Sequence, residues 1–149
     1  MSNYQNILVA IDFSEASNTV INRAIEIAQR NNTPLTVLHI VEYMPPMDIA
    51  YEPVPSVAWI DEEALVTRAK TSLDRFCKDH PLDQAKQVVI LGSPKHEICN
   101  YVRDKNCDLL ILGSHGRHGI KLLLGSTANG VLHEMPCDVL AVKLTKAVK

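Results

Sequence analysis

The sequence has no run of apolar residues long enough to cross a membrane, and its first six residues have neither the cationic start nor the apolar core of a signal peptide. Basic residues are not in excess either: 15 Lys and Arg stand against 17 Asp and Glu, a formal net charge of −2. No basic stripe of the kind that nucleic-acid binding needs is present. We therefore expect a cytoplasmic protein with no nucleic-acid partner and no membrane partner.

The sequence also lacks the cysteine spacings that indicate a zinc site or a redox pair. Its four cysteines form no Cys-x-x-Cys motif, and none lies beside a histidine at zinc-ligand spacing; they are Cys77, Cys99, Cys107 and Cys137. Each cysteine either has apolar neighbours in the sequence or lies on the face of a predicted helix. We predict reduced, partly buried thiols and no metal site.

No internal repeat or low-complexity segment divides the chain. With 149 residues, of which 46% are hydrophobic and 21% charged, it has the composition of an ordinary globular protein with a full core. We expect a single domain that spans residues 1–149.

What the sequence does contain is a regular alternation of strand and helix signals. Short apolar runs predict five strands, at Asn6–Ile11, Leu35–Val41, Val88–Leu91, Leu109–Leu112 and Val139–Val142. Apolar residues at helical spacing predict helices at residues 15–30, from Asp61 to about Lys78, after Gly92-Ser93-Pro94, and at Thr127–Met135. Ser14 is the expected N-cap of the first helix, and Leu65, Ala69, Leu73 and Phe76 are the expected buried face of the second.

Strands that are continuous apolar runs are typical of a parallel sheet covered on both faces. Right-handed strand–helix–strand crossovers then give an α/β fold with one doubly wound, five-stranded, Rossmann-like sheet. Ligands of such sheets bind beyond the carboxyl ends of the strands. The segments 10–14, 40–42 and 113–119 should therefore converge, whereas the proline-rich stretch from Tyr43 to Trp59 is a long loop of the kind that is usually functional or mobile.

A glycine-bearing loop follows the fourth predicted strand. Gly113 and Gly116 are separated by two residues, and Gly125 then precedes Ser126 and Thr127 at a helix start. Glycines let the backbone approach an anion, and a helix start offers unpaired N–H groups, so the pattern indicates a phosphate-binding loop. The alternatives are that the glycines only make a tight turn and that the hydroxyl residues only cap the helix.

Several segments, in order and across essentially the whole chain, resemble the universal stress protein family. They are Asn6-Ile-Leu-Val-Ala-Ile-Asp-Phe-Ser-Glu15, Leu38-His39-Ile40, Gly92-Ser-Pro-Lys-His-Glu-Ile98, Gly113-Ser-His-Gly-Arg-His-Gly119 with Leu124-Gly125-Ser126, and Pro136-Cys-Asp-Val-Leu-Ala-Val142. A strand–loop–helix signature in such a context is specific.

The resemblance implies a sheet of the adenine nucleotide alpha-hydrolase type with strand order 3-2-1-4-5. It also implies a cytoplasmic stress-response role and a homodimer joined through the last strand, at Val139, Leu140, Ala141 and Val142. The family contains members that bind ATP and members that bind no nucleotide. ATP-binding members have Gly, two residues, Gly, nine residues, Gly and then Ser or Thr, whereas Arg117–Leu124 leaves a gap of eight residues here.

The resemblance, together with the strand ends, indicates nine nucleotide-binding residues: Ala10, Asp12, Ile40, Leu112, Gly113, Gly116, Gly125, Ser126 and Thr127. Asp12 would accept a hydrogen bond from a ribose hydroxyl, or it is only a turn residue. Ile40, at a strand end, would offer its backbone groups to the adenine edge, and Leu112 would pack near the base or ribose. The alternative for both is that they only pack in the core. The ligand would be ATP or AMP, with Mg²⁺ brought only by the triphosphate.

Other patterns in the sequence do not indicate a metal site or a hydrolase active site. His115 and His118 lack helical spacing and neighbouring acids, so they are surface histidines rather than metal ligands. Ser114, His115 and Asp12 do not make a hydrolase triad, because adjacent Ser and His cannot align and no nucleophile elbow is present. Without a positioned base or metal clamp, any ATP hydrolysis should be slow. The functional hypotheses are a nucleotide-binding stress protein and, alternatively, a dimeric interaction module without nucleotide.

Overall fold

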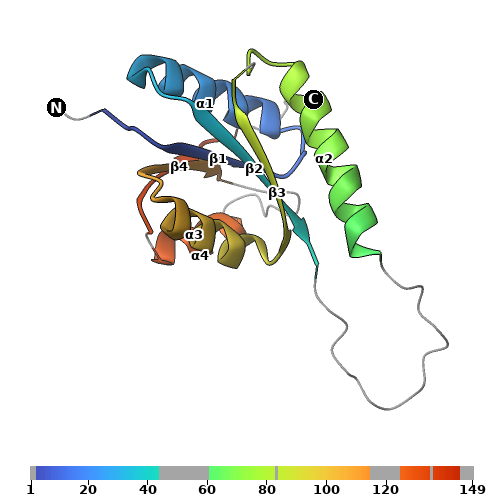
Figure 1. Ribbon diagram of the computed structural model, residues 1–149. Helices are drawn as coiled ribbons and strands as arrows, with labels where there is room; N and C mark the ends of the chain where they lie inside the picture. The colour runs from blue at the N-terminus through green and yellow to red at the C-terminus, as the bar shows by residue number, and fades with distance from the viewer. Residues whose placement is uncertain (1–2, 44–60, 83, 115–124, 135, 145–149) are drawn as a thin grey trace, which may run out of the picture.

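In the computed structural model, which describes residues 3–43, 61–82, 84–114, 125–134 and 136–144, strands and helices alternate along the chain (Figure 1). The strands are β1 (Ile7–Ile11), β2 (Leu35–Glu42), β3 (Lys86–Gly92), β4 (Leu109–Gly113) and β5 (Asp138–Val142). The helices are α1 (Ser17–Asn31), α2 (Glu62–Lys78), α3 (Pro94–Lys105) and α4 (Ser126–Glu134). The stretch 44–60, most of the expected long loop, lies outside the described residues.

The strands form one parallel sheet in the order β3-β2-β1-β4-β5, which confirms the predicted fold class and strand order. β1 lies between β2 and β4, with Ile7 aligned to both Leu35 and Leu109. The strand order therefore reverses at β1, and this is the place where a doubly wound sheet opens a crevice for a ligand.

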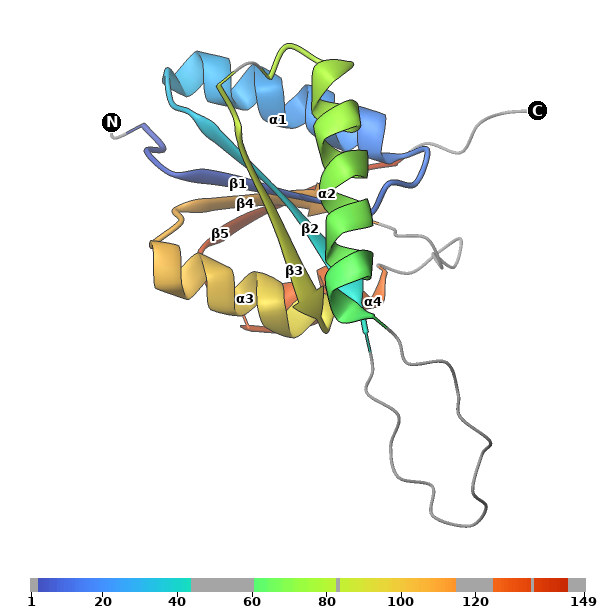
Figure 2. The same cartoon turned by 45° about the vertical axis from the view of Figure 1, so that its right-hand side comes forward.

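Alternating side chains of the central strands divide the core between the two faces of the sheet. Ile7 and Val9 point to the face covered by α1 and α2, and Leu8 points to the face covered by α3 and α4. Figures 1 and 2 show α1 on one side of the sheet and α3 on the other. All three β1 side chains are fully buried. Burial on both faces explains why this strand is an uninterrupted apolar run.

One expectation about the first helix is wrong. Ser14 is not its N-cap: α1 starts at Ser17, Ala16 is the N-cap residue, and no side chain caps it. Ser14 instead belongs to a turn, because its N–H donates to Asp12 Oδ1 (2.9 Å) and its carbonyl accepts from the Ser17 N–H (2.9 Å). Ser14 has a high propensity for the N-cap position, but the Asp12 carboxylate binds its N–H and holds this serine in the turn before the helix.

The predicted start of the second helix is confirmed. Asp61 is its N-cap, and its Oδ1 accepts a hydrogen bond from the Ala64 N–H (3.1 Å). Glu62 and Glu63 follow in the first turn, where carboxylates complement the helix dipole. The last predicted helix is observed at Ser126–Glu134, and Met135 lies outside the described residues.

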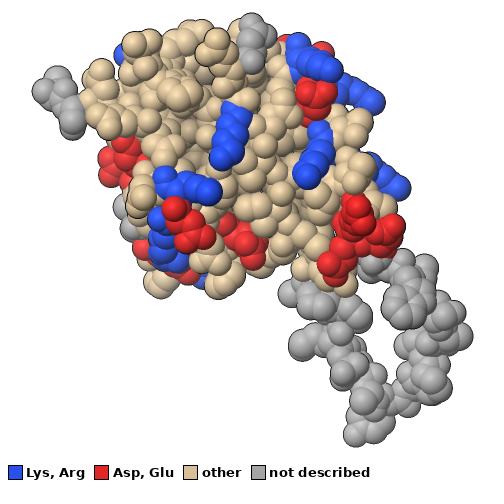
Figure 3. All heavy atoms as spheres, in the orientation of Figure 1, with Lys and Arg blue, Asp and Glu red and all other residues tan. Residues whose placement is uncertain are grey.

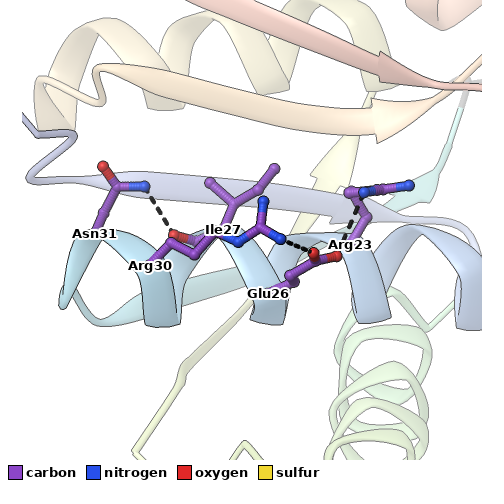
Figure 4. Close-up of polar contacts among 5 residues, drawn as sticks. All are labelled: Arg23, Glu26, Ile27, Arg30 and Asn31. Atoms are coloured by element: carbon purple, nitrogen blue, oxygen red, sulfur yellow. Dashed lines mark hydrogen bonds and ion pairs between the residues drawn. The ribbon is translucent and has the colours of Figure 1, made fainter.

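The outward face of α1 carries charge pairs along the helix (Figure 4). Glu26 pairs with Arg23 and with Arg30, and the Asn31 amide donates to the Ile27 carbonyl (2.8 Å). On the face of the molecule drawn in Figure 3, side chains of both charges are interspersed. In the part of the chain that is described, no helix is both long and apolar enough to cross a membrane.

All four cysteines are free thiols, as the sequence predicts. Cys77, Cys99 and Cys107 are buried, and Cys137 is half-buried. Burial raises the pKa of every one of them, to about 11 for Cys77 and Cys137. Thiols that stay protonated at neutral pH are poor nucleophiles and poor metal ligands.

Candidate functional site

A cavity of about 590 Å³ lies at the carboxyl ends of the strands. It is bordered by the ends of β1, β2 and β4, by the first turns of α1, α3 and α4, and by one side of α2. Its volume falls in the usual range for small-molecule sites. It occupies the crevice that the reversal of strand order at β1 creates.

The structure brings together eight of the nine residues that the sequence indicates for nucleotide binding. The eight that line the cavity are Ala10, Asp12, Ile40, Leu112, Gly113, Gly125, Ser126 and Thr127. Gly116, His115 and His118 lie outside the described residues. The expected convergence of the three strand ends is therefore observed for 10–14, 40–42 and Gly113, while the binding role of these residues stays a prediction.

Part of the cavity wall is apolar and is built from core residues. Ile40 is 7% exposed and Leu112 is 4% exposed, and both pack in the core cluster shared with α3 and α4. Ile98 of α3 and Ala128 of α4 belong to the same cluster and also line the cavity. These side chains have fixed surroundings, so they form a preformed apolar wall suited to the flat face of a ring.

Asp12 shapes the next part of the site. Its Oδ1 accepts from the Ser14 N–H (2.9 Å) and from the Ser17 hydroxyl (3.2 Å), and Ser17 is only 2% exposed. Between them, Phe13 has a φ of 61°, which a bulky residue adopts only when its surroundings impose it. The turn role of Asp12 is thus observed, and its contact with a ribose stays a prediction.

The start of α4 is held by short backbone bonds. The Gly125 N–H donates to the Ser114 carbonyl (2.7 Å), and the Ser114 N–H donates to the Val142 carbonyl of β5 (2.9 Å). Ser126 and Thr127 follow in the first turn, which contains no acidic residue. A helix start without a carboxylate keeps its N–H groups and positive dipole end available for an anion.

The side of the cavity that α1 and α2 border includes residues that no sequence pattern assigned to the site, such as His39 and Leu65. Phe13 and His39 line it with their rings 4.2 Å apart, and His39 Nδ1 lies 2.9 Å from the Ile11 carbonyl oxygen. Leu65, assigned by its spacing to the core face of α2, is half-buried and lines the cavity instead.

Within the described ranges, no three His, Cys, Asp or Glu side chains gather closely enough to hold a metal ion. The cavity itself contains two acids, Asp12 and Glu42, one histidine and one arginine among its described lining residues. Such a set provides hydrogen bonds and charge. The site geometry is that of a binding pocket at a strand-order switch.

Comparison with known proteins agrees with the fold. Residues 3–143 match the universal stress protein family. The chain belongs to this family. Universal stress protein A homolog 1 of Coxiella burnetii (strain RSA 493 / Nine Mile phase I) is 39% identical over 142 residues, which cover 93% of this chain and 96% of the relative.

Two solved universal stress protein structures extend the comparison. The universal stress protein UspA from Lactobacillus plantarum superimposes with a TM-score of 0.74 at 30% identity, covering 95% of this chain and 99% of that one. A universal stress protein in complex with cAMP gives a TM-score of 0.62 at 27% identity, covering 95% and 98% of the two chains. The second of these proteins was therefore solved with an adenine nucleotide bound.

Proposed function

We propose that this universal stress protein binds an adenine nucleotide, ATP or AMP, as a regulatory ligand in the cavity at the carboxyl ends of the strands. The observation that carries the proposal is the convergence of eight separately predicted residues on this one cavity. The complex of a related family member with cAMP supports the same ligand class. The protein acts in the stress response in the cytoplasm, as its family resemblance implies.

Each part of the nucleotide has a suitable counterpart in the cavity. Ala10, Ile40 and Leu112 provide an apolar wall for the adenine, and the Asp12 carboxylate accepts from a ribose hydroxyl. The phosphates lie toward Gly113, Gly125, Ser126 and Thr127, where the α4 N–H groups and hydroxyls donate. The sequence pattern Gly113-x-x-Gly116 assigns Gly116 to the same phosphate-binding loop. Mg²⁺ enters only with a triphosphate, through its oxygens.

No step of catalysis is part of this proposal. Fast phosphoryl transfer needs a metal clamp and a residue that orients the attacking water. The described lining residues include no cluster that could hold a metal. We therefore propose a ligand-responsive binding protein whose ATP hydrolysis, where it occurs, is slow.

Calorimetric titration of ATP with Mg²⁺ into nucleotide-stripped protein tests the proposal. Binding near micromolar strength, about −8 kcal/mol, is expected. Ser126→Asp should weaken ATP binding more than adenosine binding, because the new carboxylate repels phosphate while it suits the first turn of the helix. Asn129→Asp adds the same charge to the same helix at an exposed position that does not line the cavity, and serves as the matched control.

The absence of heat at millimolar ATP would overturn the nucleotide proposal. That result would favour the alternative of a dimeric interaction module without nucleotide. The specific observation behind the alternative is the eight-residue gap at 117–124, one residue shorter than in ATP-binding members.

A homodimer is part of the proposal in either case. β5 is the last strand of the sheet, so one of its edges has no partner strand among the described residues, and its Val139, Leu140 and Ala141 are half-buried. An apolar edge strand favours pairing with a second copy. Light scattering should give twice the chain mass of 16.5 kDa at micromolar concentration, and a stable mass of one chain would contradict it.

A further inference from the structure

Helix α2 contributes a wall of the cavity that the nucleotide proposal does not use. Its residues Leu65, Arg68, Ala69 and Ser72, at helical spacing, all line the cavity. Further along the same helix, Leu73 and Cys77 are buried in the core. The N-terminal part of α2 therefore borders the cavity, and the residues toward its C-terminus pack in the core against the sheet. Figure 2 shows α2 lying across this side of the sheet.

Arg68 is distinctive among the residues of this wall because of its charge. Among the described residues that line the cavity, it is the only lysine or arginine. Arg68 is exposed and lines the cavity, so this residue is accessible both to solvent and to a ligand.

Arg68 also has no carboxylate partner within the described part of the chain. The arginines that form ion pairs there are Arg23 and Arg30, with Glu26, and Arg103, with Glu134, and none of the ion pairs uses Arg68. The helix positions three and four residues away are Ala64, Leu65, Thr71 and Ser72, so α2 offers no acid at pairing distance. A structural role in an ion pair along the helix is thereby removed as the reason for this arginine.

We propose that Arg68 contacts the phosphate of the bound nucleotide and makes the site select phosphorylated nucleotides over the nucleoside. The inference rests on the proposed function and adds a residue to it. A guanidinium presents paired N–H donors that match the oxygens of a phosphate. α2 packs on the sheet face opposite α4, so the phosphate would be held between a cationic side chain from one face and the α4 start from the other.

The test compares the affinities of ATP, AMP and adenosine for the wild type, Arg68→Gln, Arg68→Lys and Arg75→Gln. Glutamine has a helix propensity close to that of arginine, so the exposed helix should be retained. Arg75 lies two turns further along the same helix, is exposed and does not line the cavity, which makes it the matched control.

We expect Arg68→Gln to weaken ATP and AMP binding about tenfold, the effect of one lost charge-assisted hydrogen bond, and to leave adenosine binding within about twofold. Arg68→Lys should retain part of the selectivity, and Arg75→Gln all of it. The salt dependence of ATP affinity should also become shallower in Arg68→Gln.

Unchanged ATP affinity in Arg68→Gln, with the wild type binding ATP, would overturn the role of Arg68 and leave the proposed function intact. Equal losses for ATP and adenosine would likewise overturn it, since they would indicate an effect on cavity shape rather than on phosphate recognition. A wild type that binds neither ATP nor adenosine would overturn the proposed function and this inference together.

Discussion

Replacing Asp12 by alanine should unfold the turn that connects β1 to α1, whether or not a ligand is present. The carboxylate accepts two hydrogen bonds at Oδ1, from the Ser14 N–H at 2.9 Å and from the Ser17 hydroxyl at 3.2 Å. These bonds hold Phe13 at its positive φ and satisfy a serine that is 2% exposed. Alanine removes the acceptor of both bonds and leaves the buried Ser17 hydroxyl without this partner.

The size of the effect follows from those two bonds. A hydrogen bond to a charged group contributes about 1.5–3 kcal/mol, and the half-buried position of Asp12 favours the lower value. The free energy of unfolding should therefore fall by about 3 kcal/mol. With a urea m value of about 2 kcal/mol/M, the unfolding midpoint should drop by about 1.5 M.

Urea titration followed by circular dichroism measures this midpoint. Asp12→Asn is the informative companion, because its amide oxygen accepts the same two bonds without the charge and should lose about 1 kcal/mol. Glu15→Ala, an exposed neighbouring acid outside the cavity, should change the free energy of unfolding by less than about 0.5 kcal/mol. A midpoint for Asp12→Ala that matches the wild type would refute the turn role derived from the geometry.

Three further predictions concern other parts of the chain. Asn32 ends α1 in the left-handed conformation with φ 51°. Asn32→Ala should therefore lower the free energy of unfolding in urea by about 1 kcal/mol, whereas Asn32→Gly should leave it unchanged. Equal effects of the two substitutions would contradict the role of Asn32 as a left-handed helix cap. A hydrogen bond from Arg103 (2.8 Å) lowers the pKa of Glu134. The stability advantage of the wild type over Glu134→Gln should therefore be full above about pH 5 and disappear as the pH falls below about 4. A difference between the two proteins in thermal melts that does not change with pH would argue against this. Burial raises the pKa of Cys77 and Cys137 to about 11. Both thiols should therefore react with iodoacetamide at pH 8 at least about a hundredfold more slowly in the native protein than in the urea-unfolded protein. Rapid labelling of the native protein, detected by mass spectrometry, would contradict this prediction.

The sequence predicts the fold well because the central strands are buried on both faces. Leu109–Leu112 and Asn6–Ile11 read as strands from their apolar runs alone, and the observed strands differ from them by one residue. β3 begins earlier than predicted, at Lys86, because it is an edge strand whose pairing with Thr36 tolerates polar residues. Pairing with a neighbour, which no local pattern contains, sets that boundary.

The sequence predicts only the part of the site that the order of strands and helices determines. Residues at strand ends converge by topology, so Ala10, Ile40 and Gly113 can be assigned from the order of elements. Arg68 lies in mid-helix, and its place at the cavity depends on how α2 packs across the sheet. The turn at Asp12 depends on a side-chain contact with Ser17 that competes with helix capping. Tertiary contacts of this kind have no signal in helix or strand periodicity.

The most direct test of the central claim is a titration of the ¹⁵N-labelled protein with ATP and Mg²⁺, followed through its backbone amide resonances. The account predicts shifts concentrated at the cavity, including Asp12, Ile40, Gly113 and Gly125, with Gln29, Thr33 and Ala85 of the separate pocket beside the α1 C-terminus unchanged. Shifts confined to that second pocket, or no shifts at millimolar ATP, would contradict it.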